Sequence, residues 1–391
     1  MFDRDKYRPS SCPPFGGAQD KLQRASRLSG QHQRHWIPPV EEWLIFHGVR
    51  KTRAEKNASW QLMLLIVFLG HILIASAFPS FAAEPTKLLL AHGAISNNVA
   101  PIWIAKEQGI FKKYGLDVDL VFIIAGRAMQ AMLAGQVPVG MVGGTHVLNA
   151  NTGGGDFAMI LGVENRLDYL FVAKPAIKGG EDLKGKKVAI GTPAGSASMA
   201  AYVALDHLGL VPRRDNIVLL GVGGVPERMG ALRAGSVDAT TLSPEIGQVV
   251  VSEGYRVLVD LGKENVPFQS SGIVVARSLI KSNPQLVENI AKATVEGVAF
   301  VHRPANKEIV MKSLGRNLRL DRADRIEKAY QGLVAELPKM PCPSMEGVAS
   351  MIKLMVQHGL NAKAAQVKAE DLVDMSYCKR FESSGFFRSL Y

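Results

Sequence analysis

Short apolar runs and stretches of helical spacing alternate along the chain from residue 87 onward. Residues 87–91 form an apolar run typical of a buried strand, residues 99–109 have helical spacing, and residues 116–124 again resemble a strand. A short helix over 127–135 and a strand over 137–142 complete a β-α-β-α-β series. Continuous apolar strands joined by helices, with glycine at the turns, predict a parallel sheet covered by helices.

The same series recurs one hundred residues later without a gap. Strands are predicted over 187–190, 216–220 and 237–242, and helices over 198–209 and 226–235. Alanine and glycine recur easily by chance, but strand, turn and helix stay in phase over some fifty positions, which favours an internal duplication. Identical residues at this offset include the pairs Lys87/Lys187, Ala94/Ala194, Ser96/Ser196, Ala100/Ala200, Gly109/Gly209, Met129/Met229, Ala131/Ala231, Ala134/Ala234, Gly135/Gly235 and Val137/Val237.

The predicted fold class is therefore α/β, with two lobes built on parallel sheets, a cleft between them and a C-terminal helical extension. Lobe 1 is expected over 84–173 and lobe 2 over 174–267, while residues 268–391 return to lobe 1 and end in helices broken at prolines. The chain is expected to cross between the lobes at Ala173–Pro175 and at Val266–Gln269, where the prolines suit a hinge.

A secretory signal is predicted upstream of the first strand. Lys51, Arg53 and Lys56 precede an apolar run over 62–78, which the small residues of the 80–83 segment follow. This order matches the basic region, apolar region and cleavage site of a signal peptide. The apolar run is slightly short for a membrane span, so an uncleaved anchor is the less favoured alternative.

Residues 57–83 are accordingly assigned to the signal peptide, with cleavage expected after Ala82 or Ala83. No cysteine lies near this site to receive a lipid, so a soluble periplasmic protein is expected rather than a lipoprotein. Residues 1–56 are rich in Pro, Gln, Arg and Ser without periodicity. They are interpreted as a disordered extension or as the product of a misassigned start, with Val49 as a candidate start residue.

The formal net charge of +11 does not indicate a nucleic-acid partner once it is divided along the chain. Residues 1–83 hold 11 Lys and Arg against 6 Asp and Glu, so the remainder holds 35 against 29 and carries only +6. Those charges are interspersed and form no basic run, which is typical of a solvated surface with a mild preference for anions.

The cysteines leave open whether the chain has a disulfide, and their spacing argues against a metal site. Cys342 and Cys378 fall in the predicted mature chain, where an oxidising compartment allows them to pair. Their separation of 36 residues says nothing about geometry, so a disulfide and two buried thiols remain alternatives. The chain has no CxxC and no Cys/His cluster at metal-ligand spacing, so neither a metal nor a cofactor is expected.

Four stretches, over 101–111, 132–137, 182–188 and 232–239, stand in the order and spacing of a known family. Together they resemble the periplasmic substrate-binding proteins of nitrate, sulfonate and taurine ABC importers, a group similar to thiamine-pyrimidine-precursor proteins. The similarity spans roughly 87–359. It implies a type II periplasmic-binding fold, a ligand closed between the lobes, and delivery by a monomer to an ABC permease at the inner membrane.

The loops that follow the strands are expected to line the cleft, because ligands of open parallel sheets bind beyond the carboxyl ends of the strands. Helices that start there direct backbone N–H groups and the positive end of the helix dipole toward the cleft, which favours an anion. The candidate ligand-binding residues are Ser96, Asn97, Asn98, Gly126, Arg127, Gly144, Thr145, His146, Asn165, Thr192, Gly195, Ser196, Gly223, Gly224 and Ser243.

Several candidates also have a purely structural interpretation. Serine is a preferred N-cap residue, so capping is expected at Ser96 and Ser196 whether or not they contact a ligand. Arg127 can hold a carboxylate, sulfonate or phosphate in two hydrogen bonds, or it can lie on the surface. His146 can donate to an anion, but satisfying a core carbonyl is the favoured interpretation. Trp103 can stack on a flat ligand, although a core position is expected.

The predicted function is the solute-binding component of an ABC importer that captures a small anionic or heterocyclic organic solute by hinge closure. One alternative is an enzyme on the same fold, similar to a pyrimidine-precursor synthase. The sequence has no nucleophile elbow, phosphate loop or HExxH, and it lacks the synthase's cysteine-rich cluster, so an enzyme is disfavoured. The other alternative is a sensory module, which the sequence does not separate from an importer component because both signal by closure.

Overall fold

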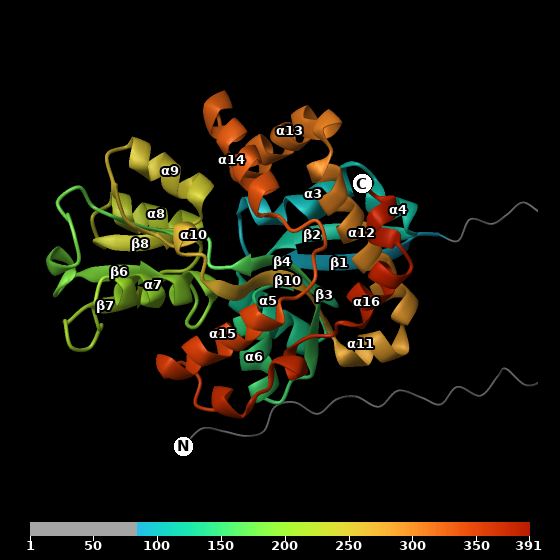
Figure 1. Ribbon diagram of the computed structural model, residues 1–391, viewed down its shortest axis with the longest axis horizontal. Helices are drawn as coiled ribbons and strands as arrows, with labels where there is room; N and C mark the ends of the chain where they lie inside the picture. The colour runs from blue at the N-terminus through green and yellow to red at the C-terminus, as the bar shows by residue number, and fades with distance from the viewer. Residues whose placement is uncertain (1–83) are drawn as a thin grey trace, which may run out of the picture. The chain divides into compact units, whose positions relative to one another are not determined.

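The computed structural model describes residues 84–391 (Figure 1). This part of the chain contains two five-stranded sheets, each covered by helices. We call the first sheet and its helices lobe 1, and the second sheet and its helices lobe 2. The strands of lobe 1 are β1 (Thr86–His92), β2 (Leu116–Phe122), β3 (Val139–Val142), β4 (Phe157–Arg166) and β10 (Pro267–Ala276). Those of lobe 2 are β5 (Leu170–Ala173), β6 (Lys187–Ile190), β7 (Val218–Gly221), β8 (Ala239–Leu242) and β9 (Arg256–Asp260).

The helices fall into three groups along the chain. Those before the first crossing are η1 (Asn97–Val99), α3 (Ala100–Glu107), α4 (Ile110–Lys113), α5 (Ala125–Leu133) and α6 (Gly144–Thr152). Those of lobe 2 are η2 (Glu181–Leu183), α7 (Ser196–His207), α8 (Val225–Arg233), α9 (Pro244–Ser252) and α10 (Leu261–Glu264). After β10 come α11 (Arg277–Ser282), α12 (Pro284–His302), η3 (Pro304–Asn306), α13 (Lys307–Leu318), α14 (Ala323–Glu336), α15 (Met345–Gln357), η4 (Ala364–Gln366), η5 (Ala369–Leu372), α16 (Ser376–Ser383) and α17 (Phe386–Ser389).

Both sheets have the same strand order. It is β2-β1-β3-β10-β4 in lobe 1 and β7-β6-β8-β5-β9 in lobe 2. Each sheet has four parallel strands and one reversed strand, because β10 pairs antiparallel with β3 and β4, and β5 pairs antiparallel with β8 and β9. The sheets are therefore mixed rather than purely parallel, and the reversed strand is the first one after each crossing.

The first crossing between lobes was placed too late by the sequence pattern. The run Leu170–Ala173 forms β5 of lobe 2, in register with Leu242 to Ala239 of β8. The chain thus crosses at residues 167–169, and the crossing predicted at Ala173–Pro175 is wrong. A short, fully buried apolar strand fits either sheet equally well, so its pattern alone did not assign it. At the second crossing, β9 and α10 lead through residues 265–266 directly into β10.

The internal duplication is visible in the backbone itself. Helices α5 and α8, and likewise α6 and α9, start and end at positions one hundred residues apart. Equivalent turns contain glycines with nearly equal positive φ angles, 71° at Gly135 and 74° at Gly235, and 99° at Gly154 and 97° at Gly254. Such left-handed conformations are favourable for glycine and costly for other residues. The two lobes are therefore built on one backbone pattern.

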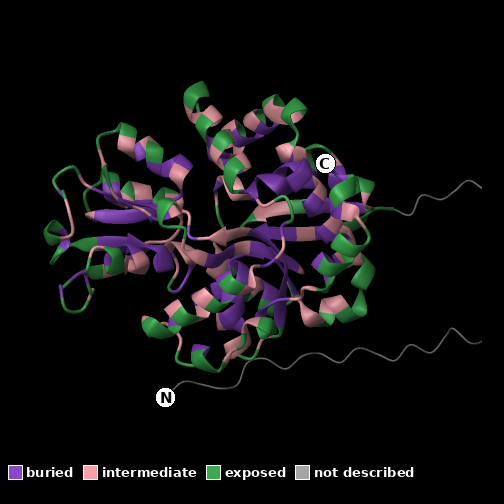
Figure 2. Cartoon of the chain, viewed as in Figure 1, coloured by how far each residue is buried: buried purple, intermediate pink, exposed green. Residues whose placement is uncertain are grey.

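Buried strands and helix faces form the core of each lobe, with the exposed residues on the outer helix faces (Figure 2). The long helix α12 packs on α3, where a Cβ at Gly297 would clash with the Pro101 carbonyl oxygen. Cys342, between α14 and α15, forms a disulfide with Cys378 of α16, with Cα atoms 5.8 Å apart. Among residues 84–391 no helix has the length and apolarity needed to span a bilayer. The predicted signal peptide lies outside the described residues.

Candidate ligand-binding site

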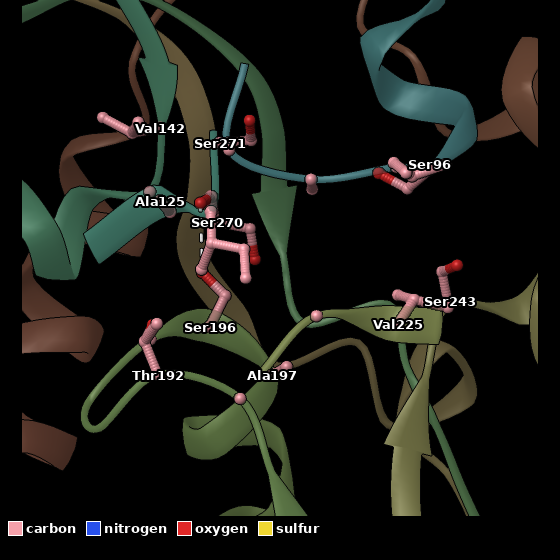
Figure 3. A pocket seen from close by; sticks show the side chains of 18 of the residues that line it. Ser96, Ala125, Val142, Thr192, Ser196, Ala197, Val225, Ser243, Ser270 and Ser271 are labelled. Atoms are coloured by element: carbon pink, nitrogen blue, oxygen red, sulfur yellow. Dashed lines mark hydrogen bonds between the residues drawn. The ribbon is translucent and has the colours of Figure 1, made fainter. Parts of the chain in front are cut away.

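A cavity of about 110 Å³ lies between the lobes, at the carboxyl ends of the parallel strands (Figure 3). Five of its lining residues immediately follow the ends of β1, β3, β6 and β8 or come shortly after the end of β7: Gly93, Gly143, Gly191, Ser243 and Gly223. This is the edge of an α/β sheet at which ligands bind, because strand ends and helix starts meet there. Both lobes contribute to the cavity, as the duplication predicts.

Four helices, α6 to α9, begin at the cavity, and they are 9 to 12 residues long. Their N-cap residues are Gly143, Gly195, Gly224 and Ser243, and none of them makes a side-chain cap hydrogen bond. Side-chain caps therefore do not satisfy the first N–H groups of α6, α7 and α8, whereas α9 begins with Pro244, which has no N–H. Unsatisfied N–H groups and the positive ends of helix dipoles together favour an anion.

Nine of the fifteen predicted site residues line this cavity: Ser96, Asn98, His146, Thr192, Gly195, Ser196, Gly223, Gly224 and Ser243. They come from loops of both lobes, which the structure brings together from positions almost 150 residues apart. Whether each one contacts a ligand remains a prediction.

The other six predicted residues do not line the cavity. Arg127 is exposed on α5, and a Cβ at Gly126 would lie 3.3 Å from Thr192 Cγ2. Thr145 is fully buried, and its Oγ1 has no hydrogen-bond partner among the described residues. The remaining three have other neighbours: Gly144 packs on Gln269, Asn97 donates its backbone N–H to Glu245, and Asn165 donates to the Cys342 carbonyl oxygen at 3.2 Å.

Capping does not account for the serines at these loops, contrary to the sequence-based prediction. Ser96 is the N-cap residue of η1, but its Oγ donates to Asn98 Oδ1 at 2.6 Å. Ser196 lies one position after the N-cap of α7, and its Oγ donates to the Ser270 carbonyl oxygen at 3.1 Å (Figure 3). The second bond joins lobe 2 to β10 of lobe 1, so this serine holds the lobes together.

Arg228 of α8 is the strongest feature that the sequence analysis missed. It is only 4% exposed, yet it lines the cavity. Its Nη1 donates to the Gly223 carbonyl oxygen at 2.7 Å and its Nε to that of Thr241 at 3.3 Å. Burial lowers the pKa of the guanidinium, and no described carboxylate forms an ion pair with it. A buried cation with only neutral partners favours an anionic ligand.

The sequence contains an indication that Arg228 is buried. Buried positions of α5 are 128, 129 and 132, and the equivalent positions of α8 are 228, 229 and 232. An arginine at the first of these positions lies on the core-facing side of a short amphipathic helix, where an unpaired charge is rare. Arg127 lies one residue away from this face and is exposed.

Carboxyl groups gather on the other side of the cavity. Glu164 lies near the end of β4, lines the cavity and accepts a hydrogen bond from Asn98 Nδ2 at 2.5 Å. Burial, Asp168 and Glu245 raise its pKa well above the usual value. Burial and Glu336 raise the pKa of Asp168 to about 7. Each of these carboxyl groups holds a proton more readily than an exposed one does.

Glu245 at the start of α9 joins the lobes from the opposite direction to Ser196. Its Oε1 accepts from the Asn97 backbone N–H at 3.1 Å and from Ser243 Oγ at 2.7 Å. Its Oε2 is buried without a hydrogen-bond partner among the described residues, and burial raises its pKa. A protonated Glu245 fits these surroundings because its charge is then absent.

Trp103 and His146, both named in the sequence analysis, lie in different surroundings. Trp103 is 5% exposed in the core of lobe 1 and packs edge-on against His92, with ring centroids 6.0 Å apart. His146 is buried, and burial lowers its pKa to about 4, so the ring is neutral at physiological pH. A neutral imidazole in the cavity wall can donate or accept one hydrogen bond but adds no charge.

The C-terminal helices contact lobe 2 on two sides, near α9 and near α7 (Figure 1). On the first side, Arg325 of α14 donates to Ser252 Oγ at 2.9 Å. On the second side, His358 Nε2 lies 3.1 Å from Asp206 Oδ2, and its ring packs on Tyr202 with centroids 4.7 Å apart. The extension thus braces lobe 1 and also holds lobe 2.

A model of the family described as NMT1/THI5 like matches residues 96–306, more than half of the chain. The chain belongs to the NMT1/THI5-like family. The match covers both lobes and both crossings, and it therefore includes every element that lines the cavity except the end of β1 and the residues up to Ile95.

Several relatives and structural neighbours of this chain are named as binding proteins. A protein of Brucella abortus (strain 2308) that is named a binding protein is 27% identical, over 59% of this chain and 70% of its own length. The solved structure of the periplasmic nitrate-binding protein NrtA from Synechocystis PCC 6803 has a TM-score of 0.62 at 14% identity, over 77% of this chain and 89% of NrtA.

The alkanesulfonate-binding protein SsuA from Xanthomonas axonopodis pv. citri, solved with bound MOPS, is a second structural neighbour. It has a TM-score of 0.60 at 18% identity, over 75% of this chain and 100% of SsuA. These likenesses confirm the predicted two-lobed periplasmic-binding fold.

Proposed function

We propose that the protein is the solute-binding component of an ABC importer and that it holds a small organic anion in the cavity between its lobes. The family and the binding-protein names of its relatives support the binding role. The observation that carries the choice of an anion is Arg228, a buried guanidinium in the cavity wall whose partners are two carbonyl oxygens. The four helix starts around the cavity add to the same preference.

Closure of the lobes is the proposed mechanism of capture. Within residues 84–391 the chain passes between the sheets only at residues 167–169 and 265–266, so rotation about these two short segments opens and closes the cavity. The bonds from Ser196 to Ser270 and from Asn97 to Glu245 form when the lobes approach. A solute that contacts both lobes favours this arrangement because it binds the closed state more tightly.

A thermal-shift screen tests the binding function. A solute that binds only the folded protein raises its melting temperature. The panel contains organic acids, sulfonates, inorganic anions and pyrimidine precursors. We expect organic anions to raise the melting temperature, and we expect Arg228→Ala to abolish the shift while Arg127→Ala, a control at an exposed arginine outside the cavity, retains it. A folded wild-type protein that responds to no member of the panel, or an Arg228→Ala variant that responds fully, contradicts the proposal.

Export and a permease partner complete the proposed function. The basic and apolar segments over 51–83 support a signal peptide, so we expect the mature protein to begin at Ala83 or Glu84. Sequencing the amino terminus of the protein recovered from the periplasm measures this directly. The proposed partner is a permease at the inner membrane that recognises the closed lobes of a monomer, without a cofactor and without catalysis. Loss of solute uptake when the gene is deleted is the expected phenotype.

A further inference from the structure

The cavity has two groups of opposite character on opposite lobes. Arg228 lines it from α8 of lobe 2, and Glu164 lines it from the end of β4 in lobe 1. Among the ion pairs of the described residues none joins the two, so both remain available to a third group. Hydroxyl groups lie around the cavity, including those of Ser96, Ser196 and Ser243 (Figure 3).

The side chain of Glu164 is an incomplete hydrogen-bonding site. Its Oε2 accepts from Asn98, and no described residue donates to its Oε1. The titratable groups that face it are Asp168 in the crossing segment, Glu245 of α9, Glu336 of α14 and Tyr169. The three carboxyl groups disfavour its negative charge, and burial does so as well. A cation or N–H donor beside this carboxyl group would relieve that repulsion.

We propose that the site selects small organic acids that also carry an amino group, with the acid group at Arg228 and the amino group at Glu164. This inference rests on the proposed solute-binding function and narrows its substrate class. A simple anion satisfies Arg228 but leaves Glu164 without a donor, and a simple amine leaves a buried guanidinium without an anion. Only a solute with both groups satisfies the two lobes at once.

The same geometry links selection to closure. Arg228 and Glu164 belong to different lobes, so a solute bound to both spans the cavity and pulls the lobes together. A site built to hydrogen-bond one group of a solute discriminates strongly against the analogue that lacks it, because the site's own polar group is then left unpaired. Glu164 is therefore the specificity-determining residue of this proposal.

Matched solute pairs test the inference by calorimetry on the wild-type protein. The pairs are 3-aminopropionate with propionate, 2-aminoethanesulfonate with ethanesulfonate, and 4-aminobenzoate with benzoate, alongside nitrate and sulfate. We expect the amino member of at least one pair to bind at least about tenfold more tightly than its partner. Equal affinities within every pair, or tightest binding of an inorganic anion, overturn the inference but leave the proposed function in place.

A charge-neutral variant shows whether Glu164 is responsible. Glu164→Gln keeps the volume and an acceptor for Asn98, and we expect it to reduce the discrimination within the pair to about twofold or less. Glu336→Gln is the matched control, since Glu336 belongs to the same acidic group but does not line the cavity. A Glu336→Gln variant that loses the discrimination equally indicates a general field effect and contradicts a direct contact.

The pH dependence separates contact from structural damage. An ammonium group binds the ionised form of Glu164, so affinity for the amino member rises with pH while Glu164 loses its proton. The partner without the amino group does not gain in this way. We expect the ratio of the two affinities to grow with rising pH in wild type and to stay constant in Glu164→Gln. A ratio that is independent of pH in wild type argues against the proposed contact. Failure of every solute to bind the folded protein would count against the proposed function itself.

Discussion

The two lobes share one backbone pattern but present different side chains to the cavity. Position 128 of α5 is a buried alanine, and the equivalent position of α8 is Arg228. Position 146 of α6 is a neutral histidine, and the equivalent position of α9 is Ile246. The duplication thus preserved the strands, helices and glycine turns, while some positions facing the cleft diverged and others, such as Ser96 and Ser196, stayed identical. At the cleft, lobe 2 contributes a cation, Arg228, and lobe 1 contributes a carboxyl group, Glu164.

The lobes also differ in how they are stabilised. The helices that follow β10 pack mainly on lobe 1, where α12 lies against α3. The disulfide joins the segment before α15 to α16. Lobe 2 is smaller and receives support from outside through α14 and α15. We therefore expect lobe 2 to be the part that moves, with lobe 1 and the C-terminal helices as its platform.

The largest expected effect concerns the disulfide that stabilises lobe 1 and its C-terminal helices. Cys342→Ser combined with Cys378→Ser removes a crosslink that closes a loop of 36 residues. Such a crosslink lowers the entropy of the unfolded chain, so we expect its loss to reduce the free energy of unfolding by about 3–4 kcal/mol. Chemical denaturation of the variant and of the reduced wild-type protein measures this. A loss below about 1 kcal/mol in both would show that lobe 1 does not depend on the disulfide.

A pair of glycine substitutions tests whether the shared backbone pattern is equally important in the two lobes. Gly135→Ala and Gly235→Ala each place a Cβ on a residue with φ near 70°. We expect each variant to lose about 1–2 kcal/mol of unfolding free energy, because the left-handed conformation is strained with a side chain. Denaturation of the two variants in parallel is the measurement. Strongly unequal losses would mean that the two matching turns contribute differently to the free energy of unfolding.

Replacement of Asp168 tests how a carboxyl group in the first crossing affects the stability of the protein. The folded state raises the pKa of this carboxyl group from 3.8 to about 7, so the folded protein binds its proton more tightly than the unfolded chain does. The stability linked to this proton is present at low pH and is lost as the pH rises from about 4 toward 7. Asp168→Asn has no such proton. We expect the variant to gain stability over wild type through this window and to keep a constant advantage above it.

Melting temperatures of Asp168→Asn and wild type across this pH range provide the measurement. Asp260→Asn is a suitable control, because Asp260 is a neighbouring carboxyl group that acts on Asp168. Parallel pH profiles of Asp168→Asn and wild type would show that Asp168 titrates normally and that the crossing stores no electrostatic repulsion.

The smallest expected effect concerns one bond between the lobes. Ser196→Ala removes the donor to the Ser270 carbonyl oxygen and leaves the helix start intact. A neutral hydrogen bond contributes about 1 kcal/mol, so we expect solute affinity to fall by up to about fivefold. Ser198→Ala, whose bond to Thr192 stays within lobe 2, is the control for titration calorimetry. Equal losses in both variants would indicate local rather than interlobe effects.

Much of the fold could be predicted from the sequence because the duplication repeats a strong pattern. Apolar runs, helical spacing and glycine turns recur at one offset, and each is a local property of the chain. Assignment of β5 failed because a buried four-residue strand carries no information about which sheet it joins. Pairing partners are a long-range property that a short apolar run does not specify.

Nine of the fifteen predicted residues line the cavity, but the two residues of opposite charge that line it, Arg228 and Glu164, were not among them. Asn165 was chosen in place of Glu164, and Arg127 was chosen while the buried arginine is Arg228. Neighbouring residues of a strand point to opposite faces, and neighbouring residues of a helix point about 100° apart, so a shift of one changes which side chain faces the cavity. Loop position is readable from the sequence, whereas the exposed face at a loop depends on tertiary packing.

The distance between the lobes tests the central claim, capture of an organic anion by closure on Arg228. Spin labels at the exposed positions Lys112 in lobe 1 and Arg213 in lobe 2 report this distance. The solute used is the one that raises the melting temperature most. The account predicts that saturating solute shortens the distance in wild type and leaves it unchanged in a folded Arg228→Ala variant. A wild-type distance that does not change on verified binding would contradict the account.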